Sequence, residues 1–229
     1  MSKLKLVVAL AGLAVASGAQ GAVVGAGNSG AGWNGFMNVF NLPAPAGDGA
    51  FQFASGWGVA DLNTSFNDLG ETLTLSPNTI GDPNSYWYTP SGGPGAAGNK
   101  IMEANLYRQI DDGSLSGQTV NFQGTVISNT FTSAHVAKLF IRDFAPDFSS
   151  FNETIVPLTV GAFSINLNTD PGAGRHVQWG FQVKGVNVWA TDTAPFGTAV
   201  ISTAAVPAPG SLAVLSLGGL LAARRRRHA

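Results

Sequence analysis

Strict alternation of apolar and polar residues, repeated in several segments, constrains the fold of this chain more than any other feature. The segment QTVNFQGTVISN places Val120, Phe122 and Val126 on one face and polar residues on the other. AFSINLN, from residue 162, and RHVQWGFQVK, from residue 175, alternate in the same way and place Phe163, Trp179 and Phe181 on the apolar face, where we expect them to be buried. Because successive side chains of a strand point to opposite faces, each segment predicts a strand with one buried face.

Further strands are predicted where apolar runs end at clusters of turn-forming residues, such as SPNTIGDPNS and TPSGGPGAAGN. Many short strands without alternating helices predict an all-β domain, an antiparallel two-sheet β-sandwich of the jelly-roll type. The glycine-rich segment 25–48 is expected to be an ordered edge loop of this domain. The further strand candidates are Phe51–Phe53, Thr72–Leu75, Met102–Arg108, Val136–Phe144, Ile155–Val160 and Val186–Ala190.

The start of the chain predicts a signal peptide over residues 1–22. Lys3 and Lys5 precede an apolar run over residues 6–16, and small residues follow it. A basic start, a short apolar run and a small-residue cleavage site are the parts of a secretory signal. The run is shorter than the roughly 20 residues of a membrane span. We therefore expect export, followed by cleavage that leaves a single domain over residues 23–205.

A second apolar segment lies at the other end of the chain. Ser211–Ala223 contains 13 residues without a charge, and it follows Pro207 and Pro209. Because proline is unfavourable inside a helix, a helix should begin after Pro209. At about 1.5 Å per residue it would cover roughly 20 Å of a hydrocarbon layer about 30 Å thick. We therefore predict a short hydrophobic helix that anchors the chain weakly, with the arginines behind it held on the cytoplasmic side.

The proline motif, the short helix and the terminal arginines together resemble the PEP-CTERM sorting signal of Gram-negative bacteria. The resemblance covers residues 206–229, with Pro-Ala-Pro where the family has Pro-Glu-Pro. It implies transient inner-membrane anchoring, processing by an exosortase-type membrane enzyme, and delivery to the cell surface or an exopolysaccharide biofilm matrix. A permanent tail anchor and a basic lipid-binding end are the alternatives. The residues concerned are Val206, Pro207, Ala208 and Pro209 in the sorting motif, and Arg224, Arg225, Arg226 and Arg227 in the cytoplasmic stop.

The charge of the central region argues against a nucleic-acid partner. All 13 acidic residues lie between Asp48 and Asp192, where only six basic residues occur, so this region carries a net charge of −7. Phosphate binding needs clustered lysine and arginine, which this region lacks. The chain has no cysteine, so disulfide and thiol chemistry are excluded and stability has to come from the core.

Titratable residues show no catalytic constellation, and we predict a protein without enzymatic activity. The central region has two histidines, His135 and His176, in no pattern typical of a catalytic triad or a zinc site. Glycoside hydrolysis needs two carboxylates, and the weak candidate pairs are Asp111 with Asp112 and, at the end of a predicted strand, Asp143 with Asp147. Asp111 and Asp112 precede a glycine, which is typical of a turn. Because calcium takes oxygen ligands from loops, these two residues are also candidates for a structural calcium site.

Aromatic residues are the remaining candidates for binding. Trp87 and Tyr88 lie beside a glycine-rich loop, and Trp57 lies in SGWG. Sugar rings stack on exposed aromatic rings, so these three are candidate glycan-binding residues. GNKIMEANLYRQIDDGSLSGQTVNFQGTV and WGFQVKGVNVW also resemble strands of galactose-binding-like and carbohydrate-binding jelly rolls. Two hypotheses follow: a structural protein of the exopolysaccharide matrix, or a carbohydrate-binding module with defined glycan specificity.

Overall fold

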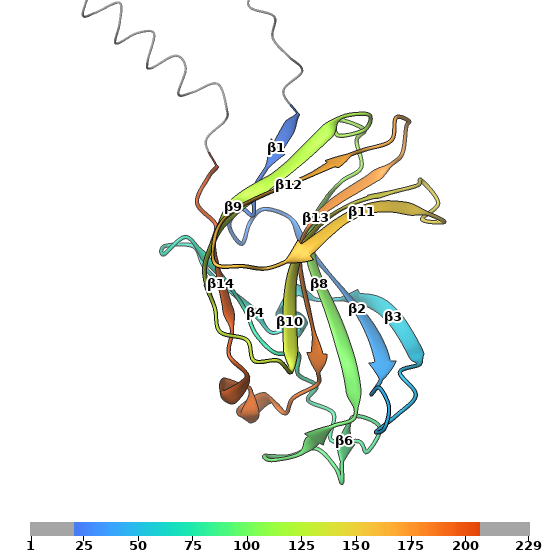
Figure 1. Cartoon of the computed structure of the whole chain (residues 1–229), viewed down its shortest axis with the longest axis vertical. Coiled ribbons are helices and arrows are strands. Elements are labelled where there is room, and N and C mark those ends of the chain that lie inside the picture. Colours follow the sequence, from blue (N-terminus) through green and yellow to red (C-terminus); the bar gives the residue numbers. More distant parts are fainter. Residues whose placement is uncertain (1–20, 207–229) are drawn as a thin grey trace, which may run out of the picture.

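The computed structural model describes residues 21–206, which form strands joined by turns and three short 3₁₀ helices (Figure 1). Nearly all of the predicted signal peptide and of the predicted C-terminal signal lies outside this range, so both stay predictions. Within residues 21–206, no helix has the length and apolar character needed to span a membrane. The elements are β1 (Ala22–Val24), β2 (Trp33–Asn41), β3 (Phe51–Trp57), η1 (Val59–Leu62), β4 (Thr64–Asn67), β5 (Thr72–Leu75), β6 (Tyr88–Thr89), β7 (Ala97–Gly98), β8 (Lys100–Ile110), β9 (Thr119–Asn129), β10 (His135–Phe144), β11 (Phe151–Pro157), β12 (Gly161–Asn168), β13 (His176–Val186), η2 (Ala190–Asp192), η3 (Ala194–Phe196) and β14 (Ala199–Ser202).

Two six-stranded sheets contain nearly all of the strands, and β6 and β7 form a small third sheet. Sheet B has the order β11-β10-β13-β8-β2-β3, and all of its pairs are antiparallel. Sheet A is built on β9, with β12 along one edge and β14, β5 and β4 on the other side. These two sheets confirm the predicted all-β, two-sheet fold.

One strand pair departs from the predicted antiparallel arrangement. β1 runs parallel to β9, with Ala22 beside Val120 and Val24 beside Phe122. β12 occupies the opposite edge of β9 over these residues. β1 therefore shares an edge of β9 with β14, because β14 pairs only with the far end of that strand.

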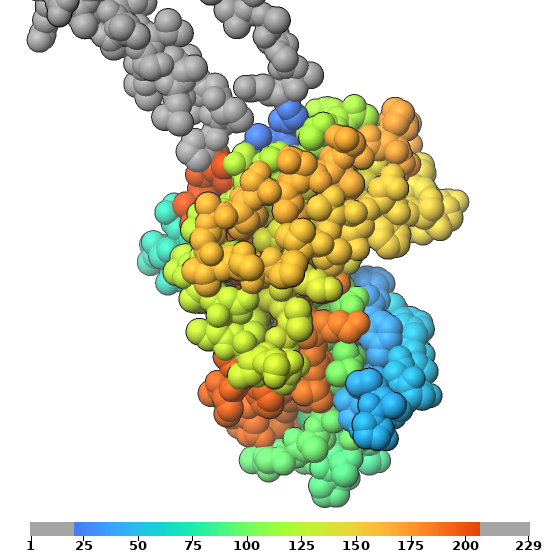
Figure 2. Space-filling model, viewed as in Figure 1, coloured from blue at the N-terminus to red at the C-terminus, as the bar shows by residue number. Residues whose placement is uncertain are grey.

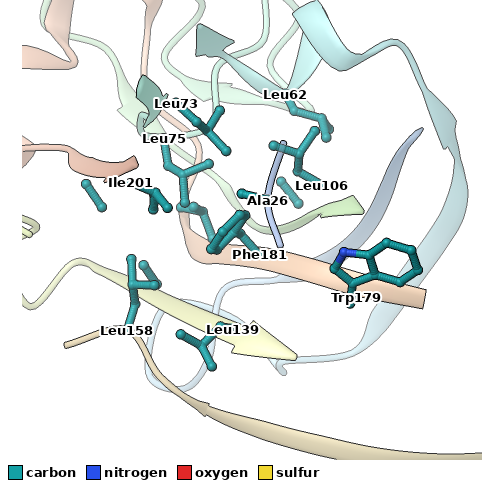
Figure 3. Close-up of a cluster of buried hydrophobic side chains, with 14 of the residues drawn as sticks. Ala26, Leu62, Leu73, Leu75, Leu106, Leu139, Leu158, Trp179, Phe181 and Ile201 are labelled. Atoms are coloured by element: carbon teal, nitrogen blue, oxygen red, sulfur yellow. The ribbon is translucent and has the colours of Figure 1, made fainter. Parts of the chain in front are cut away.

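The core lies between the inner faces of the two sheets (Figure 3). Phe122 of sheet A meets Phe181 of sheet B with their ring centroids 5.6 Å apart. Both rings and Trp179 are buried, as predicted, whereas Phe163 is only half-buried against the core. At about 25 cal/mol per Å² of apolar surface, burial of rings of this size is the main force that holds the sheets together.

The N-terminal part of the sandwich differs from the prediction. Segment 25–48 was expected to be an edge loop, but β2 lies inside sheet B between β8 and β3. Met37 and Val39, two residues apart, are completely buried on one face of β2, so the period of two extends into this segment despite its glycines, although Phe36 and Phe40 make the opposite face partly apolar. Conversely, the strand predicted for Val186–Ala190 is absent from the described structure, because β13 ends at Val186 and η2 begins at Ala190.

Both ends of the described chain leave the sandwich at the same end (Figure 1). Val206 packs against the segment that follows β1, where a β-carbon added to Gly25 would lie 3.1 Å from Cγ2 of Val206. Arg108 of β8 holds this segment against sheet B, because its Nε donates a hydrogen bond to the carbonyl oxygen of Ala31 at 2.8 Å. Trp179 also donates from its indole nitrogen to the carbonyl oxygen of Gly25 at 3.0 Å. The two chain ends are thus held together on one side of the core.

Candidate functional site

The outer face of sheet B contains a groove of about 880 Å³. Its residues come from β2, β8, β13, β10 and β11, and from the turn between β10 and β11. Figure 2 shows the hollow between the β11 region, in yellow, and the β2–β3 region, in blue. We call this the outer groove; the residues used below are Phe36, Asn105, Tyr107, Gln109, Lys138, Arg142, Phe144, Phe148, Phe151, Glu153, Gln178 and Gln182.

Strand register brings these residues into rows that cross the sheet. Arg142 of β10 lies beside Gln178 of β13, which lies beside Gln109 of β8. Two rows further along the same face, Lys138 lies beside Gln182, which lies beside Asn105. Because alternate residues share a face, these polar rows lie opposite the apolar residues of the core.

The polar rows form a hydrogen-bonded ladder at the floor of the outer groove. Oδ1 of Asn105 accepts hydrogen bonds from Nη1 of Arg142 at 2.9 Å and from Nε2 of Gln182 at 3.1 Å. Nε2 of Gln178 donates to Oε1 of Gln109 at 2.6 Å. Asn105, Gln178 and Gln182 are only 2%, 6% and 3% exposed. Their amides are therefore held in fixed orientations, since a buried amide without a partner costs about 1–3 kcal/mol.

A glycine lies in the middle of the ladder, between two residues with aromatic side chains. Gly180 of β13 lies between Phe140 of β10 and Tyr107 of β8 on the outer face. A β-carbon at this position would overlap the carbonyl oxygen of Leu106, so only glycine fits the close approach of β13 to β8. Burial raises the pKa of Tyr107, and the negative charge of Asp111 adds to the effect. The Tyr107 hydroxyl therefore stays protonated and can act as a hydrogen-bond donor at neutral pH.

Aromatic rings form one wall of the outer groove. Phe144 packs on Phe151 with ring centroids 4.9 Å apart, and Phe148 stacks on His176 at 4.0 Å with an interplanar angle of 12°. Phe148 and Phe151 are each 52% exposed. Nδ1 of His176 lies 2.7 Å from Oδ1 of Asp111, which fixes the ring under Phe148. The wall thus presents exposed apolar rings beside a polar floor.

Charged residues of the outer groove are mostly paired. Nε of Arg142 forms an ion pair with Glu153, and its guanidinium lies 4.0 Å from the centroid of the Phe140 ring. Glu103 also lines the groove, and its Oε2 lies 3.0 Å from Nζ of Lys184. Within residues 21–206, Lys138 forms neither a salt bridge nor a side-chain hydrogen bond. One positive charge in the groove is therefore available to a ligand.

The three aromatic residues proposed from the sequence lie elsewhere. Tyr88 is completely buried, and its hydroxyl lies within hydrogen-bond distance of the carbonyl oxygens of Ile80, at 2.7 Å, and Val188, at 3.0 Å. The prediction of a glycan-stacking role for Tyr88 is therefore wrong, because its ring packs in the interior. Trp87 is half-buried, in edge contact with Phe53 and Tyr86, and is packed against the core.

Trp57 is also half-buried, and it lines a separate shallow pocket formed with η1 and the Thr79–Gly81 segment. Its indole nitrogen donates to Oγ of Ser55 at 3.0 Å. The structure therefore does not bring Trp57 and Trp87 into the outer groove, which is lined by other residues.

The aspartates proposed for calcium or catalysis have protein partners. Asp111 accepts from His176 and from Nε2 of Gln109, and Asp112 accepts from the backbone nitrogen of Ser114. Within residues 21–206, no cluster of three or more histidine, cysteine, aspartate or glutamate side chains could hold a metal ion. The calcium site stays a prediction.

Asp143 is fully buried on the inner face of β10. Its Oδ1 lies 2.8 Å from Nε of Arg175, and its Oδ2 accepts from the backbone nitrogen of Asp170 at 2.7 Å. These contacts tie the β12–β13 connection to the core, because Asp170 lies in that connection. They are the contacts of a structural carboxylate, away from the outer groove.

Sequence reasoning missed the outer groove because it identified single exposed aromatic residues. The signal that could have found it is the second face of β13, where His176, Gln178 and Gln182 alternate with core residues. Glutamine on one face of a long central strand indicates a covered polar surface when its neighbouring strands also supply amides. Comparison of the chain with protein-family models, with curated proteins and with solved structures found no match.

Proposed function

We propose that this chain is an exported protein of the cell surface or extracellular matrix whose β-sandwich binds a polysaccharide in the outer groove. The observation that carries the proposal is the combination of a fixed amide floor with an exposed aromatic wall on one sheet face. Sugars offer hydroxyl groups to amides and apolar C–H faces to aromatic rings, so both surfaces have a partner in the same ligand. A groove of about 880 Å³ has room for several sugar rings.

The hydrogen bonds of the described residues leave suitable partners for hydroxyl groups. In residues 21–206, the side-chain oxygens of Gln178 and Gln182 accept no hydrogen bond, and the Tyr107 hydroxyl takes part in none. Nε2 of each glutamine already donates one hydrogen bond within the protein, and this bond fixes the direction of the free side-chain oxygen. The floor therefore combines free acceptors with a free donor, a set that matches a hydroxyl-rich ligand.

The order of strands supports a jelly-roll relationship for the domain, which we include in the proposal. From β8 to β14 the chain changes sheets at every connection except the β10–β11 hairpin. β13 also inserts between β8 and β10, so the chain returns to a position between earlier strands. Repeated crossing between two sheets is typical of jelly rolls.

The predicted terminal signals give the proposal its location. An exosortase-type enzyme would process the chain after Val206, at the segment Pro207–Pro209, while Arg224–Arg227 hold it in the inner membrane. Because both ends leave the sandwich on one side, the outer groove on a lateral face would stay open to the surrounding exopolysaccharide (Figure 1). C-terminal mass spectrometry of protein released from cells tests this step, and intact arginines on the released form would contradict it.

Binding in the groove is tested with the purified domain and a panel of bacterial exopolysaccharides. Affinity electrophoresis and calorimetry should detect binding, and Tyr107→Ala should weaken it roughly 10-fold through the loss of about 1.5 kcal/mol of ring contact. Trp57→Ala is the matched control, since it removes a half-buried ring outside the groove. Circular dichroism checks that both variants are folded.

Two results would contradict the binding proposal. One is the absence of binding to every polysaccharide in the panel, which would leave a structural role in the matrix. The other is an equal loss of affinity in Trp57→Ala and Tyr107→Ala. Release of new sugar ends by the wild-type protein would contradict the proposed absence of catalysis.

A further inference from the structure

The positive charges of the domain gather at the outer groove. The region between Asp48 and Asp192 has only six basic residues against 13 acidic ones. Lys138 and Arg142 line the groove, and Lys184 lies in the next row of the same sheet face. A domain with a net charge of −7 thus places half of its basic side chains on one face.

Pairing distinguishes these three cations. Arg142 is paired with Glu153 and Lys184 with Glu103, so their charges are largely neutralised within the protein. Lys138 has no such partner among the described residues, although it is half-buried in the middle of the sheet. An anionic partner that enters the groove can therefore form a charge-assisted hydrogen bond with this ammonium group.

The neighbours of Lys138 define what that partner should be. Its row crosses the sheet from Pro157 of β11 through Gln182 and Asn105 to Phe36 of β2. The ammonium group therefore stands beside amides that can bind hydroxyl groups and within a groove with apolar walls. A ring that carries a carboxylate and hydroxyl groups together matches these three surfaces.

We propose that the outer groove selects a polyuronate, with one uronate carboxylate bound by the ammonium group of Lys138. This inference rests on the proposed polysaccharide binding and specifies its substrate class. Glu103 and Glu153 line the groove, but each is paired with a cation of the same sheet face. Charges beyond about 8 Å are largely screened at physiological ionic strength, so the remaining acidic residues of the domain do not prevent contact with a polyanion. At contact, a charge-assisted hydrogen bond is among the strongest single polar interactions.

The experiment compares matched ligands with the full domain. Oligosaccharides of polygalacturonate and polymannuronate are measured beside their carboxyl-reduced forms, which keep the chain but lose the charge. Wild-type protein should bind a polyuronate at least 10-fold more tightly than its reduced form. Lys138→Gln should lose roughly 10- to 100-fold in affinity for the charged form only, the range expected for a hydrogen bond to a charged group.

Two control variants separate charge from structure. Lys138→Arg keeps the charge and should retain most of the affinity. Lys100→Gln removes the same charge outside the groove, where Lys100 donates to Asn41 and lies over the Tyr86 ring, and it should bind as the wild type does.

The outcomes distinguish this inference from the proposed function. Equal binding of the charged and reduced forms, unchanged in Lys138→Gln, would overturn the polyuronate while polysaccharide binding stands. Binding confined to sulfated polysaccharides would also overturn it. Binding of no polysaccharide of any kind would instead overturn the proposed function itself.

Discussion

The two faces of sheet B are formed by the same strands, and their central residues are nearly equally buried, yet their chemistry is different. On β13, the inner face carries Trp179 and Phe181, and the outer face carries Gln178 and Gln182, all of them 6% exposed or less. The burial of apolar rings on the inner face follows from the hydrophobic effect. The burial of amides on the outer face is tolerated only because the hydrogen-bonded ladder satisfies their polar atoms.

The stability of the fold explains the residues of the inner face, but it does not explain the residues of the outer face. Burying apolar rings lowers the free energy of the folded state without further conditions. Burying three amides and an arginine brings little net stability, because their hydrogen bonds replace equivalent bonds to water. A polar face that is costly to build and gives little stability favours a role outside folding, and the proposed polysaccharide binding is such a role.

The largest effect is expected on the inner face. Phe181→Ala should lower the free energy of unfolding by about 3–5 kcal/mol, because the ring is buried between Phe122 of sheet A and Trp33 of sheet B. Urea denaturation followed by tryptophan fluorescence measures the change. A loss below about 1 kcal/mol would mean that the inner face does not control stability, and the contrast between the faces would fail.

A smaller effect is expected at the floor of the outer groove. Asn105→Ala removes the acceptor shared by Arg142 and Gln182, and should cost about 1–3 kcal/mol through the two unsatisfied donors. Asn105→Asp, which keeps the acceptor, is the matched control and should retain more stability. Denaturation and polysaccharide binding are measured together, and we expect Asn105→Ala to reduce binding. Normal binding with lowered stability would show that the ladder serves folding alone.

The smallest effect concerns His135, the buried histidine of the inner face. His135 lies on the inner face between Phe131 and Phe196, and burial lowers its pKa from the ordinary 6.5, despite the opposing hydrogen bond to the carbonyl oxygen of Val186. Just below pH 6.5 the unfolded chain therefore binds more protons than the folded chain does. The stability that the neutral, buried His135 contributes is complete above pH 6.5 and should be lost as the pH falls below it.

Urea denaturation between pH 7.5 and pH 5 measures this loss. His135→Gln is the control, and its stability should vary less over the interval, because glutamine does not titrate. Identical curves for the wild type and His135→Gln would show that the buried histidine carries no pH dependence.

The fold was largely predictable because the alternation of apolar and polar residues can be recognised within each strand separately. Alternation located β9, β12 and β13, and the apolar runs located β5 and β10 to within a residue or two. β2 was missed because glycine-rich composition was given more weight than the alternation of Met37 and Val39. The parallel pairing of β1 depends on where the chain enters the sheet, which no local pattern specifies.

The candidate site was less predictable because it depends on register between strands that are distant in the sequence. Asn105, Arg142 and Gln182 come from β8, β10 and β13, and each is an ordinary polar residue on its own strand. Only the pairing of these strands shows that the three side chains meet. Tyr88 illustrates the converse error, since its place in an aromatic cluster beside glycines suggested exposure and its hydroxyl is bonded in the interior.

The neighbouring ends of the described chain make the domain suitable for insertion into another protein. The segment after β1 and Val206 are in contact, so a short linker could join the two ends without disturbing either sheet. Domains with adjacent ends tolerate circular permutation and placement within a surface loop of a host protein. A new opening in the 90–96 loop, between β6 and β7, would leave every strand of sheet B intact. We therefore expect that the domain can be transplanted together with its outer groove, without the predicted terminal signals.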